Sequence, residues 1–382
     1  MGDPVREPVT VCVTNFNGED YLGPCLDALA IMEGHVVEII VVDNASTDGS
    51  IDLLSSRPDV GPPLRVISMP DNDGPCPARN AALAAANTRW VFQLDSDVVV
   101  KPDTLTTLLP EIAAPGVAAV MPRAVLADDP SVIHYDGGNM HYVGVMCLDR
   151  LMAPVEGAPT EPEDVDAVIC MALLLDREVV RVAGGFDEAF FILFEDHDLS
   201  YRLRARGLRL RHVPASVVLH LAGTPGISYR PGAPSYPERR AWLHARNRAY
   251  LVLKNYSWPA ILATLPGRFV YATIFFIFAA KRGVLTSYLK GRIELLGLLP
   301  RALRLRRQLG GSRVLGDREL LVAQDITISR VIQRSRFEAK VEKTFNGVLR
   351  AWWRAARWLI PESRTRMNRP DPHLGTAGPS QA

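Results

Sequence analysis

Two carboxylates, one residue apart, follow a short apolar run in the first third of the chain. The run, residues 90–94, has the length and composition of a buried strand, and Asp95 and Asp97 come directly after it. Side chains at the end of such a strand project into the crevice beyond the sheet. There they could hold a divalent cation, Mg²⁺ or Mn²⁺, that neutralises the charge of a departing pyrophosphate. A solvated turn is the alternative, because Asp-x-Asp is common by chance.

A third carboxylate and an arginine stand at comparable positions. Asp43 closes the apolar run 38–42 and could accept a hydrogen bond from a nucleobase N–H, or it could merely shape the turn and cap the next helix. Asn72 begins another turn into a helix, and Arg79 would lie within about the first turn of that helix. If the helix starts at the crevice, Arg79 points toward an anionic ligand.

The segment 184–199 mixes carboxylates with aromatic residues just before an expected helix. Glu195 and Asp196 precede that helix, whose partial positive charge would keep a carboxylate ionised. An ionised carboxylate beside an apolar rim suits a general base that takes the proton from an acceptor hydroxyl. Simple helix capping is the alternative. Asp198 and Arg202, four residues apart on the helix, should form a surface ion pair.

Alternating strands and helices must position these residues. Apolar runs rich in β-branched residues indicate buried parallel strands at 9–13, 38–42, 64–69 and 90–94, and helical patterns lie between them at 21–32, 51–56 and 78–86. Three strand–helix–strand repeats imply right-handed crossovers and an α/β fold with a doubly wound, mostly parallel sheet. Ligands of such sheets bind beyond the carboxyl ends of the strands, where polar residues cluster as Thr14-Asn15, Asp43-Asn44 and Asp95-Ser96-Asp97.

The second part of the chain continues this alternation before its character changes. Strands are expected at 117–121, 165–175 and 208–213, with a helix at 198–206. Residues 223–238 contain four Pro and three Gly, which is typical of a mobile loop, and a helix should follow at 242–256. Beyond that helix the chain becomes strongly apolar over residues 261–280.

The composition is that of a globular protein with unevenly distributed charge. With 48% hydrophobic and 22% charged residues, disordered and fibrous classes are excluded. Five cysteines without CxxC spacing indicate reduced core thiols, and the first residues lack the apolar segment of a secretory signal, so we expect a cytoplasmic protein. Residues 281–382 carry 21 Lys and Arg against 8 Asp and Glu, whereas residues 1–280 carry 22 against 34. The basic part should therefore face an anionic surface.

Two segments suggest what that surface is. Pro266-Gly267-Arg268 interrupts the apolar residues 261–280 and leaves a run shorter than the ~20 residues of a membrane span, so an interfacial or packed helix is expected. Residues 351–358 mix Trp with Arg, as helices lying on anionic lipid do. We expect peripheral contact with the inner face of the plasma membrane, with homodimerisation through an apolar stripe as the alternative. No recognised motif for nucleic acid accompanies the basic part, and we expect no such partner.

Six short motifs occur in a fixed order along the first two thirds of the chain. They are Val-Thr-Asn-Phe-Asn-Gly-Glu, Val-Val-Asp-Asn-Ala-Ser-Thr-Asp-Gly-Ser, Asn-Asp-Gly with Ala-Arg-Asn, Leu-Asp-Ser-Asp, Gly-Gly-Phe-Asp-Glu with Glu-Asp-His-Asp-Leu and Arg, and His-Leu-Ala-Gly-Thr. Each motif is weak alone, but six in order are highly specific. Over about residues 8–256 the set resembles family 2 glycosyltransferases, in particular the rhamnosyltransferase-like branch that acts on bacterial surface glycans.

The resemblance implies a GT-A fold. It also implies an enzyme that transfers a sugar from a metal-bound nucleoside diphosphate sugar, with inversion at the anomeric carbon. Asp196 then matches the general base, with Glu195 and Trp242 on the acceptor side, and Asp97 and His220 match the metal ligands. The nucleotide-sugar-binding residues would be Thr14, Asn15, Asn17, Asp43, Asn72, Arg79, Asp95 and Ser96.

The resemblance also divides the chain. It implies a catalytic domain at 1–222, with a nucleotide-binding half at 1–100 and an acceptor half at 101–222. An active-site loop and closing helix follow at 223–260. A helical, basic extension occupies 261–382, and about its last 20 residues are expected to be disordered.

The donor and acceptor stay open. Rhamnose from a thymidine diphosphate donor is the first expectation by resemblance, and a glycan, a lipid-linked glycan or a natural product could accept it. Residues 169–172, Ile-Cys-Met-Ala, are bulkier than the small residues usual there. A sugar nucleotidyltransferase would want a Gly-rich, Lys-containing loop, which residues 15–18 do not provide. A non-catalytic relative is the other alternative, although all the expected carboxylates are present.

Overall fold

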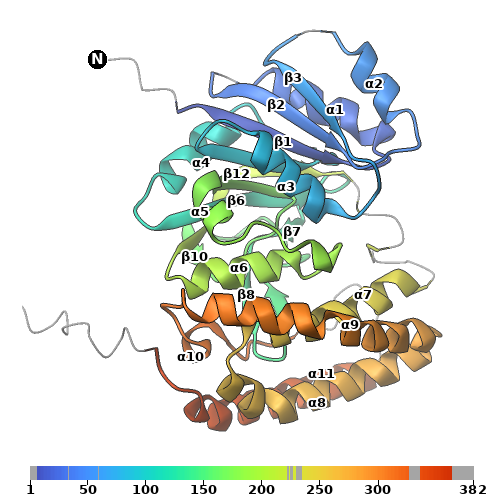
Figure 1. Cartoon of the computed structure of the whole chain (residues 1–382), viewed down its shortest axis with the longest axis vertical. Helices are drawn as coiled ribbons and strands as arrows, with labels where there is room; N and C mark the ends of the chain where they lie inside the picture. Colours follow the sequence, from blue (N-terminus) through green and yellow to red (C-terminus); the bar gives the residue numbers. More distant parts are fainter. Residues whose placement is uncertain are drawn as a thin grey trace, which may run out of the picture.

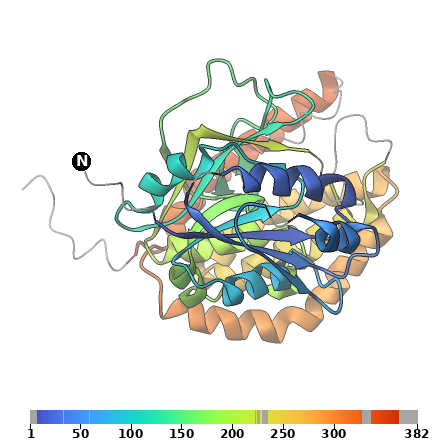
Figure 2. The same cartoon turned by 90° about the horizontal axis from the view of Figure 1, so that it is seen from above.

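The computed structural model describes residues 7–363 apart from 33, 59, 222, 224–226, 229–234 and 327–335. Its centre is a ten-stranded mixed sheet with helices on both faces (Figure 1; Figure 2). Four strands at one side run parallel in the order β4-β1-β2-β3. They are β1 (Val9–Asn15), β2 (Val36–Asp43), β3 (Leu64–Ser68) and β4 (Trp90–Asp95). The predicted α/β fold with a doubly wound, mostly parallel sheet is confirmed.

Each of these strands divides its side chains between two cores. Val11 and Val13 of β1 belong to the core that α1 (Glu19–Ala30) and α4 (Thr104–Ile112) cover. Cys12, between them, belongs to the core that α3 (Pro75–Ala85) covers, because successive side chains of a strand point to opposite faces. The short helix α2 (Ser50–Ser56) connects β2 to β3. All five cysteines are buried free thiols, as expected.

The other side of the sheet differs from the sequence prediction. The strand expected at 165–175 is two strands: β10 (Glu163–Val165) pairs with β12 (Arg209–His220), and β11 (Ala172–Asp176) runs antiparallel between β4 and β6 (Val117–Leu126). Between the two strands, the amides of Val168 and Cys170 donate to Ser200 Oγ and Asp196 Oδ1. Side chains of a helix therefore take up backbone groups that a continuous strand would have paired with its neighbours.

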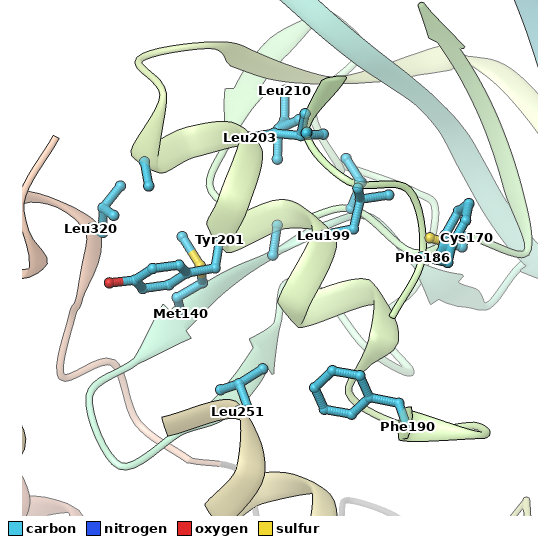
Figure 3. Packing of buried hydrophobic residues seen from close by; sticks show 14 of the residues in the cluster. Met140, Cys170, Phe186, Phe190, Leu199, Tyr201, Leu203, Leu210, Leu251 and Leu320 are labelled. Atoms are coloured by element: carbon cyan, nitrogen blue, oxygen red, sulfur yellow. The ribbon is translucent and has the colours of Figure 1, made fainter. Parts of the chain in front are cut away.

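Short elements complete the part of the chain that surrounds the sheet. They are β5 (Val98–Val99), β7 (Ile133–Tyr135), β8 (Gly138–His141), β9 (Val145–Leu148), α5 (Arg177–Val182), η1 (Glu188–Phe190) and α6 (Glu195–Ala205). Helix α6 begins three residues earlier than expected, so Glu195 and Asp196 form its first turn instead of preceding it. The side chains of Leu199, Tyr201 and Leu203 project from α6 into one core cluster (Figure 3).

The ion pair between Asp198 and Arg202 is buried, and the prediction of a surface pair was wrong. The two side chains are 0% and 3% exposed. Asp198 also accepts hydrogen bonds from Lys254 Nζ at 2.9 Å and Asn255 Nδ2 at 2.8 Å. Periodicity on one helix could not reveal these partners, because they come from another helix 56 residues later.

A helical layer packs beneath α6 and forms the lower half of the molecule in Figure 1. Its elements are α7 (Glu238–Asn255), α8 (Trp258–Lys281), α9 (Leu285–Gly310), α10 (Asp317–Leu320), α11 (Arg336–Ala356) and η2 (Arg357–Leu359). Asp187, just before η1, accepts hydrogen bonds from Lys254 Nζ at 2.8 Å and Arg301 Nη2 at 2.7 Å. We call Asp187, Asp198, Arg202, Lys254 and Arg301 the ion cluster. It ties the helical layer to α6.

Helix α8 runs unbroken through Pro266, so the interruption expected there was wrong. Pro266 has no N–H to donate to the preceding turn. Side chains supply donors nearby: Thr264 Oγ1 donates to Ala260 O at 2.6 Å, and Arg268 Nη2 donates to Ile261 O at 2.7 Å. At 24 residues, α8 is long and apolar enough to cross a membrane by length and composition, and 22% of its most apolar 18-residue stretch is buried.

Candidate functional site

The carboxyl ends of β1, β2 and β4 bring several of the predicted ligand residues together. The strand register places Asn15 beside Asp43 and Thr14 beside Asp95. Asn15 Nδ2 donates to Asp43 Oδ1 at 2.8 Å. Ser46 donates to both oxygens of Asp43, from Oγ to Oδ1 at 2.6 Å and from its amide to Oδ2 at 2.9 Å. Asp43 is therefore a buried carboxylate whose Oδ2 can accept one further hydrogen bond.

The polar residues around Asp43 fasten the neighbouring loops to one another. Asn17 Oδ1 accepts a hydrogen bond from the amide of Thr47 at 2.8 Å. Asn72 Oδ1 accepts one from Asn44 Nδ2, also at 2.8 Å. The amide of Ser96 donates to the carbonyl oxygen of Thr14 at 3.1 Å. These bonds order the loops that follow β1, β2, β3 and β4 around one end of the sheet.

Arg79 joins β4 to α6. Its side chain is 3% exposed, with Nη2 at 2.8 Å from Asp95 Oδ1 and Nη1 at 3.3 Å from Glu195 Oε1. The sequence predicted Arg79 as a ligand for an anion, and in the structure the guanidinium is occupied by two protein carboxylates. Its positive charge still lies between Asp95, at the end of β4, and Glu195, at the start of α6.

The first two residues of α6 have different surroundings. Burial raises the pKa of Glu195, and the neighbouring Asp196 raises it further, against the opposing effect of Arg79. Asp196 is half-buried, and its Oδ1 accepts the amide hydrogen of Cys170 at 3.1 Å. Met171 follows Cys170 in the chain, and its carbonyl oxygen accepts a hydrogen bond from the amide of Asp95 at 2.9 Å. Residues 170–171 therefore hold Asp196 and Asp95 at the same end of the sheet.

Asp97 and His220 meet because β5 pairs with the end of β12. His220 Nε2 lies 3.1 Å from Asp97 Oδ2. Two donors bound at about 2.1 Å in neighbouring positions of an octahedral Mg²⁺ would be about 3 Å apart, so this pair fits such a cation. Within the part of the chain that the structure describes, no group of three or more His, Cys, Asp or Glu is arranged to hold a metal. Substrate oxygens and water would complete the coordination, as is usual for Mg²⁺.

His134, in β7, contacts His220 and was no candidate in the sequence. The two Nδ1 atoms are 2.7 Å apart, and the rings stack with centroids 4.7 Å apart. Since Nε2 of His220 faces Asp97, its Nδ1 hydrogen can point to His134, which fixes the orientation of the His220 ring. A single His within Ile-His-Tyr gives no sign of this in the sequence.

The loop before α6 has a strained backbone. Phe191, Leu193 and Phe194 have φ of 64°, 69° and 74°, a region that costs non-glycine residues on the order of 1–2 kcal/mol each. Asn247 of α7 holds this loop, because its Nδ2 lies 2.8–3.0 Å from the carbonyl oxygens of residues 190, 192 and 193. Strain of this kind persists where the surroundings enforce it, and it concentrates at active sites.

We expect Asn247→Ala to lower kcat about tenfold while the KM for the donor changes little, since misplacing reacting groups by about 1 Å costs up to 100-fold. The loop leads into Glu195 and Asp196 and is remote in sequence from the loops that follow β1, β2, β3 and β4. Steady-state kinetics on the folded fraction measures both constants. Glu238→Ala, an exposed change on the same helix, is the control. An unchanged kcat in folded Asn247→Ala would show that the loop keeps its shape without Asn247.

Trp242 lies in the contact between α7 and α9. Its Nε1 donates to Glu294 Oε2 at 2.8 Å, and Lys290 Nζ stands 4.6 Å from its ring centroid. The structure thus gives Trp242 a packing role in place of the predicted contact on the acceptor side. Most of the loop predicted at 223–238 lies outside the described residues.

Residues 10–152 match the family model described as Glycosyl transferase family 2. The succinoglycan biosynthesis protein ExoO of Rhizobium meliloti is 34% identical over 143 residues, which are 37% of this chain and 39% of that protein. The pre-mycofactocin glycosyltransferase of Mycobacterium tuberculosis is 36% identical over 221 residues, which are 57% of this chain and 43% of that protein. This chain thus spans less than half the length of these curated relatives.

Solved structures share the fold at low sequence identity. GalNAc-T7 with UDP, GalNAc and Mn²⁺ aligns with a TM-score of 0.53 and 17% identity, covering 70% of this chain and 52% of that one. Staphylococcus aureus TarS 1–349 in complex with UDP-GlcNAc aligns with a TM-score of 0.50 and 16% identity, covering 91% and 92%. The prediction of a GT-A fold is confirmed. Through residues 10–152, the chain is similar to glycosyl transferase family 2.

Proposed function

We propose that the chain transfers one sugar from a nucleoside diphosphate sugar to an acceptor hydroxyl, with inversion at the anomeric carbon. The family 2 domain supports glycosyl transfer. The observation that carries the proposal is the connection of Asp196 to the Asp95–Asp97 end of β4, through residues 170–171 and through Arg79 beside it. A candidate base and a candidate diphosphate site thereby lie at the same end of the sheet.

The reaction is a single displacement. The acceptor oxygen attacks the anomeric carbon, its proton passes to Asp196, and the bond from that carbon to the diphosphate oxygen breaks. A divalent cation held by Asp97 and His220 would neutralise the charge of the leaving diphosphate. Asp196 suits the base because its Oδ1 is fixed by the amide of Cys170 and its side chain is only half-buried. Glu195 suits it less, because its raised pKa favours the protonated form.

The proposal assigns Asp43, Thr14, Asn15, Asn17 and Asn72 to the nucleoside side of the donor, and Arg79, Asp95 and Ser96 to its diphosphate and ribose. Thymidine diphosphate rhamnose is the first donor to test. The acceptor class includes glycans, lipid-linked glycans and natural products. The division into catalytic residues 1–222 and an extension, a cytoplasmic location, peripheral membrane contact and a homodimer belong to the same proposal.

A panel of nucleotide sugars tests the reaction directly. We expect slow hydrolysis of one donor without acceptor, dependent on Mg²⁺ or Mn²⁺, and NMR of the glycoside formed with an acceptor should show an inverted anomeric configuration. Retention of configuration would contradict the single displacement. Binding of nucleotide sugars without any turnover across the panel would favour a non-catalytic relative.

Replacing Asp43 with Asn should raise the KM for the donor about tenfold and change kcat less than twofold, since a charge-assisted hydrogen bond to the base contributes roughly 1.5–3 kcal/mol. Asn retains the shape of Asp43 and can still accept from Asn15 Nδ2 and Ser46 Oγ through Oδ1, whereas the amide of Ser46 loses its acceptor Oδ2. Asp48→Asn is the matched control, because Asp48 accepts backbone hydrogen bonds in the same loop. Equal effects of the two substitutions on KM would assign Asp43 to loop structure alone.

A further inference from the structure

The outward side of α8 is apolar along its length. Its exposed large side chains are 41–70% exposed, and from Trp258 to Phe276 they recur every three, four or seven residues, with Ile277 next to the last: Trp258, Leu262, Leu265, Phe269, Phe276 and Ile277. The spacing places them along one stripe of the helix. A surface helix of a water-soluble domain normally shows polar residues on that side. Figure 1 places α8 at the end of the molecule opposite α2 and β3.

Helix α9 repeats the arrangement. Leu289, Ile293, Leu296 and Leu303 are 38–68% exposed and follow one another at helical spacing. We refer to these four residues and the six of α8 as the outer stripes. Exposed apolar stripes that run along two helices are typical of a binding site for a membrane or a protein.

The inner side of α8 is occupied by the protein. His244 of α7 stacks on Phe275 at 4.2 Å between centroids, and its Nε2 lies 3.1 Å from Tyr271 Oη. Gly267 lies so close to the Tyr142 ring that an added Cβ would stand 2.4 Å from its hydroxyl oxygen. A helix with one side packed on its own domain can lie in a membrane interface, but it is not free to cross a bilayer alone.

Two of the three tryptophans that suggested lipid contact in the sequence, Trp352 and Trp353, face inward. Trp353 is 6% exposed and stacks on Tyr142 at 5.0 Å between centroids. Trp352 Nε1 donates to the carbonyl oxygen of Ala263 at 2.9 Å. Among the tryptophans of that segment, Trp358 is the one that is largely exposed. The structure therefore moves the candidate lipid contact from residues 351–358 to α8 and α9.

The charged residues of α8 and α9 are almost all basic. Residues 258–310 contain nine Lys and Arg and a single acid, Glu294. Five of the basic residues are exposed at or near the ends of the outer stripes: Lys281, Arg282, Lys290, Arg304 and Arg307. Apolar stripes flanked by Lys and Arg are the pattern of helices that lie on anionic lipid.

We propose that the outer stripes of α8 and α9 seat the chain on an anionic bilayer, with α8 lying in the plane of the interface. This specifies the membrane contact within the proposed function. His244 contacts both Phe275 of α8 and Phe194, the residue before Glu195, with the latter ring centroid 5.2 Å away. The seated helix is thus one aromatic layer from the acceptor side of the site, which favours an acceptor that reaches the site from the lipid.

Vesicle co-sedimentation of the full chain tests the seating. The vesicles contain phosphatidylcholine alone or phosphatidylcholine with phosphatidylglycerol. We expect binding to the anionic vesicles at low salt, weaker binding to the neutral ones, and loss of at least tenfold in partitioning for Leu262→Glu with Phe269→Glu and for Ile293→Glu with Leu296→Glu. Ile31→Glu is the control, because Ile31 is 64% exposed on the catalytic domain, like Leu262 and Ile293 at 68%.

Vesicle binding and analytical ultracentrifugation distinguish lipid binding from the other possible occupants of the outer stripes. No binding of the unmodified chain to anionic vesicles at low salt would overturn the proposal, as would binding of both double variants at the unmodified level. A dimer in analytical ultracentrifugation that these variants convert to monomers would assign the stripes to a second copy. Donor hydrolysis without vesicles should be the same in all variants. Its absence in the unmodified chain would contradict the proposed catalysis and leave the lipid result standing.

Discussion

Asp196→Asn should lower glycosyl transfer by at least about 100-fold and leave binding of the nucleotide sugar unchanged, because a general base contributes roughly 10²–10⁴-fold. Asn retains the size of Asp and can still accept the amide hydrogen of Cys170, so the start of α6 keeps its geometry. What it loses is the ability to take the acceptor proton. Single-turnover transfer measures the chemical step, and calorimetry with the donor or its nucleoside diphosphate measures binding.

Two further variants test whether the loss of transfer is due to Asp196 itself. Glu188→Gln is the matched control, because Glu188 is an exposed carboxylate nearby that accepts a hydrogen bond from Asn80 Nδ2. Glu195→Gln tests the neighbouring carboxylate, whose raised pKa makes it the weaker base candidate. Near-normal transfer by Asp196→Asn together with collapse in Glu195→Gln would transfer the role to Glu195.

Asp97→Ala should reduce transfer by about 100-fold and weaken Mn²⁺-dependent binding of the nucleoside diphosphate by at least tenfold. The expectation follows because neutralising charge on the leaving group typically lowers the barrier by several kcal/mol. In the unmodified chain, Asp97 Oδ2 and His220 Nε2 lie 3.1 Å apart as neighbouring donors. Removing the carboxylate leaves an imidazole alone, and the carboxylate is the donor that Mg²⁺ and Mn²⁺ prefer.

Electron paramagnetic resonance of Mn²⁺ gives a readout that does not depend on activity. The unmodified chain with nucleoside diphosphate should bind one Mn²⁺, and Asp97→Ala should leave most of the ion free in solution. Asp103→Ala is the control, since Asp103 is an exposed carboxylate six residues farther along the chain. Full transfer in excess chelator would contradict a metal-dependent mechanism.

The first four strands were predictable because their signal is local. Runs of β-branched residues predicted strands at 9–13, 38–42, 64–69 and 90–94, and the structure extends them by at most a few residues, as in β2 (Val36–Asp43). The polar residues at their ends also fell where the parallel register brings them together. Resemblance to the family, rather than periodicity, supplied the roles of Asp196, Asp97 and His220.

The sequence could not reveal contacts that depend on distant segments. Spacing along α6 suggested an exposed pair for Asp198 and Arg202, but burial there is decided by Lys254 of α7. The left-handed residues before α6 are Phe and Leu, which local propensity would not place there. Their conformation depends on Asn247, which is more than 50 residues later in the chain.

The ion cluster also has a consequence for the synthesis of the chain. Asp187 is made 67 residues before Lys254 and 114 residues before Arg301. At roughly 5–20 residues per second, the ribosome needs about 6–23 s to deliver Arg301 after Asp187. Until Lys254 and Arg301 have been made, Asp187 lacks both cations that pair with it in the finished structure, and leaving a charge unpaired in a protein interior is strongly destabilising. Asp187 lies in the segment that leads into α6, so this part of the candidate site reaches its final charge balance only after α9 has emerged.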